Sequence, residues 1–189
     1  MHTTLRRRLL AAAAITTLAV SGAAVTGATA SSATSTATSA SAAPYCGITW
    51  GSLPKATSPA LLWSGRLEGH RSGQHSCYDR VVFDIGRGAG TLGYSVRYVS
   101  TVTSPGSGFP VAVSGGARLQ VTINAPSVLA ASTTNYPGWR TFRQLRSVGS
   151  FEGYTDYGLG VRARLPMRAF VLTDTDGGRR LVVDVAHAW

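Results

Sequence analysis

The sequence has few cysteines, few acidic residues and almost no lysine, and each shortage excludes a class of protein. Two cysteines in 189 residues cannot form a disulfide-dense miniature fold or a four-cysteine zinc site. Only 14% of the residues are charged, too few for a coiled coil, whereas 44% hydrophobic residues are too many for a wholly disordered chain. The sequence contains no established motif of a serine hydrolase, zinc protease, phosphate loop or redox dithiol.

Arginine supplies almost all of the positive charge. The chain has 18 basic residues against 8 acidic ones, a formal charge of +10, and Lys55 is its only lysine. Arginine alternates with aromatic residues in the second half, and guanidinium groups pair well with carboxylates and phosphates. We therefore predict a face that binds an anionic polymer of sugars, formed by Arg97, Tyr98, Arg118, Trp139 and Arg140. The alternative is that arginine serves solubility and the aromatic rings lie in the core.

The first 30 residues are typical of a secretory signal peptide. Arg6–Arg8 form a positive start, an apolar stretch follows, and Ala28-Thr-Ala30 is a small-residue cleavage site. The apolar stretch is too short for a membrane anchor. Cleavage would remove three arginines and lower the formal charge from +10 to +7. A twin-arginine export signal is the alternative, and no membrane anchor is expected after cleavage.

Residues 31–43 consist only of Ser, Thr and Ala, which predicts a disordered spacer before a single domain over residues 46–189. In an exported protein the two cysteines are expected to form one disulfide, Cys46–Cys77. The alternative is a reactive thiol at Cys77, because His75 lies two residues away.

Short β-branched runs alternate with glycine, proline and serine turns, which is typical of an all-β domain. We predict a β-sandwich of about eight short strands, with a small barrel as the alternative. The expected strands are 80–85, 94–99, 110–113, 117–123, 144–151, 160–165, 169–172 and 180–186. A hairpin turn is expected at residues 174–178, and residues 125–140 are expected to form a long loop.

Two of these strands resemble each other, Arg80-Val-Val-Phe-Asp-Ile85 and Arg180-Leu-Val-Val-Asp-Val185. Each places an arginine and an aspartate on the face opposite three apolar residues. In an antiparallel pair, Arg80 would meet Asp184 while Asp84 meets Arg180. We expect structural ion pairs there, or else solvated charges on two core strands.

Candidate catalytic and metal-binding residues are sparse. His70 and His75 lie in a polar stretch that is expected to be a solvated turn, and His187 is expected to be exposed. Glu152 has no recognisable partner for general acid catalysis. We therefore predict no catalytic residues, metal or cofactor, unless His70, His75 and Glu152 meet in one cleft, as a hydrolase would require.

Several blocks, in order along the chain, resemble the AMIN-like domain proteins that actinobacteria export. The blocks are Cys46-Gly-Ile-Thr-Trp-Gly-Ser-Leu-Pro54, His70, Cys77-Tyr-Asp-Arg-Val-Val-Phe-Asp84, Gly93-Tyr-Ser-Val-Arg-Tyr-Val99, Gly106-Ser-Gly108, Gly116-Ala-Arg-Leu-Gln-Val121, Phe151-Glu-Gly153 and Arg180-Leu-Val-Val-Asp-Val185. The resemblance implies a β-sandwich related to the AMIN domain, which localises envelope proteins to peptidoglycan.

From the charge and this resemblance we expect a secreted, monomeric, non-catalytic module associated with the cell wall. Its expected partner is peptidoglycan or a teichoic-type polymer. The alternatives are an uncharacterised hydrolase, or a module that binds or inhibits a secreted protein through the loop 125–143. Nucleic acid is not expected as a partner, because the chain has an export signal and no nucleic-acid motif.

Overall fold

The computed structural model describes residues 45–57 and 62–189, and within these residues the fold is all β. The predicted signal peptide 1–30 and spacer 31–43 lie outside the described residues. The sequence predicts about eight strands, whereas the described residues form twelve. They are β1 (Lys55–Thr57), β2 (Leu67–Gln74), β3 (Tyr78–Ile85), β4 (Tyr94–Val99), β5 (Val102–Thr103), β6 (Pro110–Val111), β7 (Ala117–Ile123), β8 (Thr133–Asn135), β9 (Phe142–Phe151), β10 (Tyr154–Val161), β11 (Met167–Thr173) and β12 (Arg179–Ala186).

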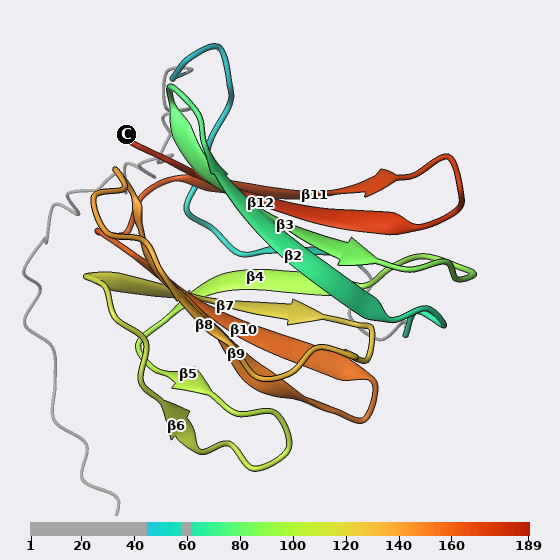
Figure 1. The fold of residues 1–189 in the computed structure, drawn as a ribbon. Helices are drawn as coiled ribbons and strands as arrows, with labels where there is room; N and C mark the ends of the chain where they lie inside the picture. The colour runs from blue at the N-terminus through green and yellow to red at the C-terminus, as the bar shows by residue number, and fades with distance from the viewer. Residues whose placement is uncertain (1–44, 58–61) are drawn as a thin grey trace, which may run out of the picture. The chain divides into compact units, whose positions relative to one another are not determined.

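Two antiparallel sheets make up most of the fold, and Figure 1 shows the four-stranded sheet lying across the six-stranded one. The larger sheet has the strand order β1-β4-β7-β10-β9-β8, and the smaller has the order β11-β12-β3-β2. A short sheet of β5 and β6 lies on the side of the larger sheet that faces away from the smaller (Figure 1). This sandwich-like arrangement confirms the predicted fold class.

The core fills the space between the two sheets. Alternate residues of each strand enter it, because successive side chains of a strand point to opposite faces. Burial of each large apolar side chain contributes about 1.5–3 kcal/mol. Fully buried core residues from both sheets include Val81, Phe83, Val96, Leu119, Val121, Leu159, Leu181 and Val183.

The structure corrects three predictions of local structure. The polar stretch from His70 to His75, expected to be a turn, lies in β2 up to Gln74; the strand is polar because it is at the edge of its sheet. The strand expected at 160–165 is β10, Tyr154–Val161, where glycines interrupt the apolar alternation. The expected loop 125–140 contains the three-residue strand β8.

Other predictions of covalent and local structure are confirmed. Cys46 and Cys77 form a disulfide, so Cys77 is not a free thiol. The β11–β12 hairpin turns at Asp174–Gly178, where the backbone N–H of Asp174 donates to the carbonyl oxygen of Gly178 at 3.0 Å. Strands β3 and β12 are antiparallel neighbours in the predicted register, with Arg80 opposite Asp184 and Asp84 opposite Arg180.

Candidate functional site

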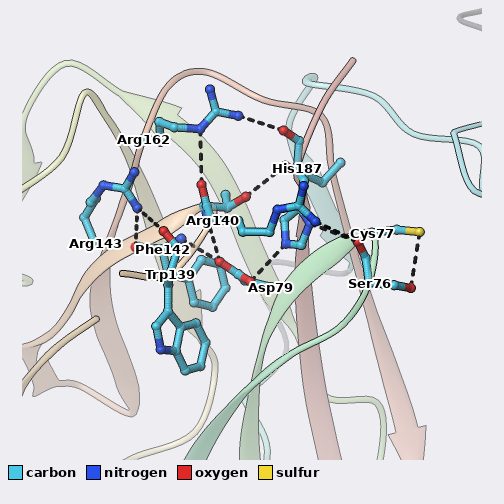
Figure 2. Close-up of polar contacts among 11 residues, drawn as sticks. Ser76, Cys77, Asp79, Trp139, Arg140, Phe142, Arg143, Arg162 and His187 are labelled. Atoms are coloured by element: carbon cyan, nitrogen blue, oxygen red, sulfur yellow. Dashed lines mark hydrogen bonds and ion pairs between the residues drawn. The ribbon is translucent and has the colours of Figure 1, made fainter. Parts of the chain in front are cut away.

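A buried aspartate and histidine connect the two sheets at one end of the sandwich, and we call this pair the Asp79–His187 clamp (Figure 2). One carboxylate oxygen of Asp79 accepts the backbone N–H groups of Thr141 and Phe142, both at 2.8 Å. The other oxygen lies 3.0 Å from Nε2 of His187. Asp79 is fully buried and His187 is 6% exposed, so the prediction of an exposed His187 is wrong. Its ring is buried because Ser76 and Asp79 offer polar partners there.

Arginines surround the clamp and donate to backbone carbonyl oxygens (Figure 2). Arg162 bonds to the carbonyl oxygens of Arg140, at 3.2 Å, and His187, at 2.7 Å. Arg140 itself reaches the carbonyl oxygen of Ser76 at 3.5 Å. Trp139 is half-buried, with its ring stacked on Phe142 at a centroid distance of 6.0 Å. At this end of the sandwich, guanidinium groups and the indole ring therefore contribute to packing.

A polar groove of about 730 Å³ lies on the outer face of the larger sheet. We call it the arginine groove; its lining residues are Ser100, Thr101, residues 110–114, Arg118, Gln144 and Arg146. Arg118 donates from Nε to the carbonyl oxygen of Val113, and Arg146 donates from Nη1 to that of Ala112, both at 2.8 Å. Each bond fixes a guanidinium group that carries five N–H donors.

A smaller hollow of about 350 Å³ adjoins the arginine groove and shares Ser100 and Arg118 with it. Arg164 lines this hollow, and its guanidinium carbon lies 4.9 Å from the centroid of the Tyr98 ring. The Tyr98 hydroxyl donates to the carbonyl oxygen of Leu165 at 2.7 Å. Burial raises the pKa of Tyr98 to about 12, so this hydroxyl keeps its proton at neutral pH.

The structure divides the five predicted binding residues into two groups. Tyr98 and Arg118 line the same hollow, and Arg97 lies opposite Gln120 on the outer face of the larger sheet. Trp139 and Arg140 precede β9, three strands across from β4, or about 14 Å at the usual strand spacing.

Near Arg97, the buried Asp156 accepts a hydrogen bond from Gln120 at 2.9 Å. Burial raises the pKa of Asp156, and the positive charge of Arg97 is among the influences that oppose this shift.

Only one of the two expected ion pairs between β3 and β12 forms. Arg80 bonds to the fully buried Asp184, with Nε to Oδ1 at 2.7 Å. Asp84 and Arg180 lie opposite each other four residues further along the strands, but they do not pair with each other. Asp84 pairs with Arg71 of β2, and Arg180 pairs with Asp174 of the hairpin turn. Because the polar sequence of β2 does not predict a strand, the competing Arg71 could not be foreseen beside Asp84.

A second arginine also pairs with Asp184, and its guanidinium group lies close to three aromatic rings. Arg168 of β11 donates from Nε to Oδ2 of Asp184 at 2.7 Å. Its guanidinium carbon lies 5.4 Å from the ring centroid of Trp50, 5.3 Å from that of Tyr78 and 5.2 Å from that of Phe170. We call Trp50, Tyr78, Arg80, Arg168 and Phe170 the arginine–aromatic face.

All five residues of the arginine–aromatic face are partly exposed, on the outer side of the smaller sheet. This combination could not be predicted from the sequence, because its members come from three separate segments: β3, β11 and the residues before β1. They meet only in the folded domain.

The histidines and the glutamate considered for catalysis do not form one site. His70 and His75 are five residues apart along β2 and its turn, or about 16 Å in an extended strand. Burial lowers the pKa of His70, whose ring packs against Tyr157. Glu152 lies in the β9–β10 turn. Among the described residues, no three metal-binding side chains gather around a common point.

The chain belongs to the AMIN-like domain family, whose model matches residues 65–187, more than half of the sequence. Members of this family are non-catalytic modules related to the cell envelope. No significant match appears among curated proteins or among solved structures. In the described part of the chain, no helix has the length and apolar character of a membrane span.

Proposed function

We propose that this protein is a secreted, non-catalytic module that binds peptidoglycan or another anionic glycopolymer of the cell wall. Membership of the AMIN-like family supports an envelope role. The observation that carries the proposal is the arginine–aromatic face, where three rings and two guanidinium groups share one sheet surface.

The chemistry of this face suits a polymer of sugars that carries negative charge. Aromatic rings offer flat apolar surface to the C–H faces of a sugar ring, and guanidinium groups bind carboxylates in pairs of hydrogen bonds. Asp184 neutralises one of the two arginines and fixes both in place. The face therefore keeps a net positive charge in an arrangement that needs little reordering on binding.

Sedimentation with purified cell walls tests the proposal. We expect the protein to sediment with walls at low salt and to be released as salt rises, because screening weakens exposed charge contacts. Trp50→Ala should reduce the bound fraction several-fold. Phe109→Ala, which removes a 72% exposed ring from the β5–β6 connection, is the matched control and should bind normally.

Two results would count against the proposed binding to cell walls. Absence of sedimentation at low salt would reject wall binding altogether. Sedimentation of Trp50→Ala equal to that of the unsubstituted protein would reject the arginine–aromatic face as the contact surface.

A second candidate function is binding to a secreted protein, and exposed apolar side chains at the β9–β10 turn favour it. A Cβ atom at Gly106 would lie 2.9 Å from Cγ of Phe151, and one at Gly153 would lie 3.1 Å from Cδ1 of Leu62. Both side chains are exposed, and separate segments therefore pack beside them. The loop 125–143 contributes the exposed Val128. A partner from culture supernatant that binds the unsubstituted protein but not Phe151→Asp, together with no wall binding, would favour this function.

A further inference from the structure

We propose that the arginine groove is a binding site for organic phosphate groups. The groove lies on the outer face of the six-stranded sheet, whereas the arginine–aromatic face belongs to the four-stranded sheet. The two proposals therefore concern different surfaces, which substitutions can test one at a time.

Two glycines of β10 lie beneath residues 113–114, which line the groove. Gly158 and Gly160 lie at outward positions of this central strand, between the buried residues Tyr157, Leu159 and Val161. A Cβ atom at Gly158 would lie 2.6 Å from Cγ2 of Val113, and one at Gly160 would overlap the carbonyl oxygen of Ser114. Because both positions lack a side chain, residues 113–114 can lie directly on the sheet.

Side chains of the flanking strands hold residues 112–114 in place over the two glycines. Arg118 of β7 bonds to Val113, and Arg146 of β9 bonds to the preceding residue, Ala112. Gln144 accepts the backbone N–H of Ser114 at 3.0 Å. The two guanidinium groups are thus anchored to consecutive carbonyl groups and line the same groove.

Each anchored guanidinium retains donors for a ligand. Within the described residues, Arg118 and Arg146 each use one N–H group in these bonds, out of five on a guanidinium. Neither arginine forms an ion pair with a described acid, and no acidic residue lines the groove. Two uncompensated positive charges in a recess attract an anion, and the recess concentrates their field.

The lining favours phosphate as the chemical class of that anion. The hydroxyl groups of Ser100, Thr101 and Ser114 add hydrogen-bonding groups beside the two guanidiniums, and a phosphate offers several charged acceptor oxygens. The volume of about 730 Å³ exceeds what an inorganic ion needs. Pro110 and Val111 provide apolar surface for the carbon skeleton of a phosphorylated sugar or polyol.

Isothermal titration calorimetry at fixed salt tests this site. The probes are glycerol 3-phosphate and poly(glycerol phosphate), and glycerol is the blank. Binding of both probes identifies a phosphate site open to small molecules, and binding of the polymer alone identifies phosphodiesters of a wall polymer as the source. We expect the double variant Arg118→Gln/Arg146→Gln to bind the active probe about tenfold more weakly or worse, as expected for lost charged hydrogen bonds.

Three further variants keep the result unambiguous. Thr101→Glu places a negative charge at an exposed position of the groove without removing any of its anchoring bonds, so it should abolish binding in a folded protein. Arg87→Gln removes an exposed arginine outside the groove and should change nothing. Trp50→Ala should keep phosphate binding, and the groove variants should still sediment with phosphate-free peptidoglycan. Absence of binding of both probes, or equal binding by Thr101→Glu, would overturn the proposal.

Discussion

At the scale of single residues, arginine has a structural task that explains much of its abundance. Seven arginines in the described residues donate to backbone carbonyl oxygens, and three of them reach two carbonyls each. A guanidinium carries its donors in a rigid fork, which a lysine ammonium lacks. Part of the positive charge therefore supports strand ends and connections. The seven are Arg118, Arg140, Arg143, Arg146, Arg162, Arg164 and Arg179.

The Asp79–His187 clamp gives the sharpest prediction at this scale. The buried carboxylate of Asp79 accepts two backbone N–H groups and contacts His187. Asp79→Asn replaces one of its two oxygens with an N–H₂ group, which cannot accept a hydrogen bond. We expect a loss of about 2–4 kcal/mol in the free energy of unfolding. Urea unfolding followed by tryptophan fluorescence measures it. Asp176→Asn, at an exposed turn position, should leave stability nearly unchanged.

At the scale of secondary structure elements, the sequence predicted strands where apolar residues alternate, and failed where other constraints dominate. The β3–β12 register followed from two similar strands with opposite charges at matching positions. Strand β2 was missed because its sequence is polar along an exposed sheet edge. Strand β10 was misplaced because its outward positions are glycines, required by a segment far away in sequence. The arginine–aromatic face was also missed, because its members are distant in sequence and come together only in the folded domain.

The glycines of β10 can be tested directly. Gly160→Ala places a methyl group against the carbonyl oxygen of Ser114, a backbone atom that cannot rotate away. We expect a loss of about 1–3 kcal/mol in stability, as for other overpacked sites. Thermal unfolding by circular dichroism provides the measurement. Gly73→Ala in β2 has no atom within 4 Å of the new Cβ, so an equal loss there would contradict this explanation.

At the scale of the whole described molecule, two long-range connections hold segments that are distant in sequence. The disulfide joins Cys46 to Cys77 at the start of β3, and the clamp joins Asp79 of β3 to His187. The two connections meet at one end of the sandwich, because Cys77 directly precedes β3 and Asp79 is the second residue of that strand (Figure 2). Removing either one should loosen the same end.

The double variant Cys46→Ser/Cys77→Ser measures the contribution of the disulfide. Closing a loop between residues 31 positions apart should stabilise the fold by about 3–4 kcal/mol, mainly by restricting the unfolded chain. Urea unfolding with and without reductant should show this loss for the unsubstituted protein under reduction. The double variant should be equally unstable in both conditions, and any further response to reductant would contradict the assignment.

The position of β12 also sets the order in which the protein can fold. This strand is the last of the twelve in the chain, yet it lies inside the smaller sheet, between β11 and β3. Until residues 179–187 are available, β3 lacks one neighbour, β11 lacks its partner and Asp79 lacks His187. A chain that emerges from its N-terminus during synthesis would therefore leave this sheet incomplete until its final residues are free.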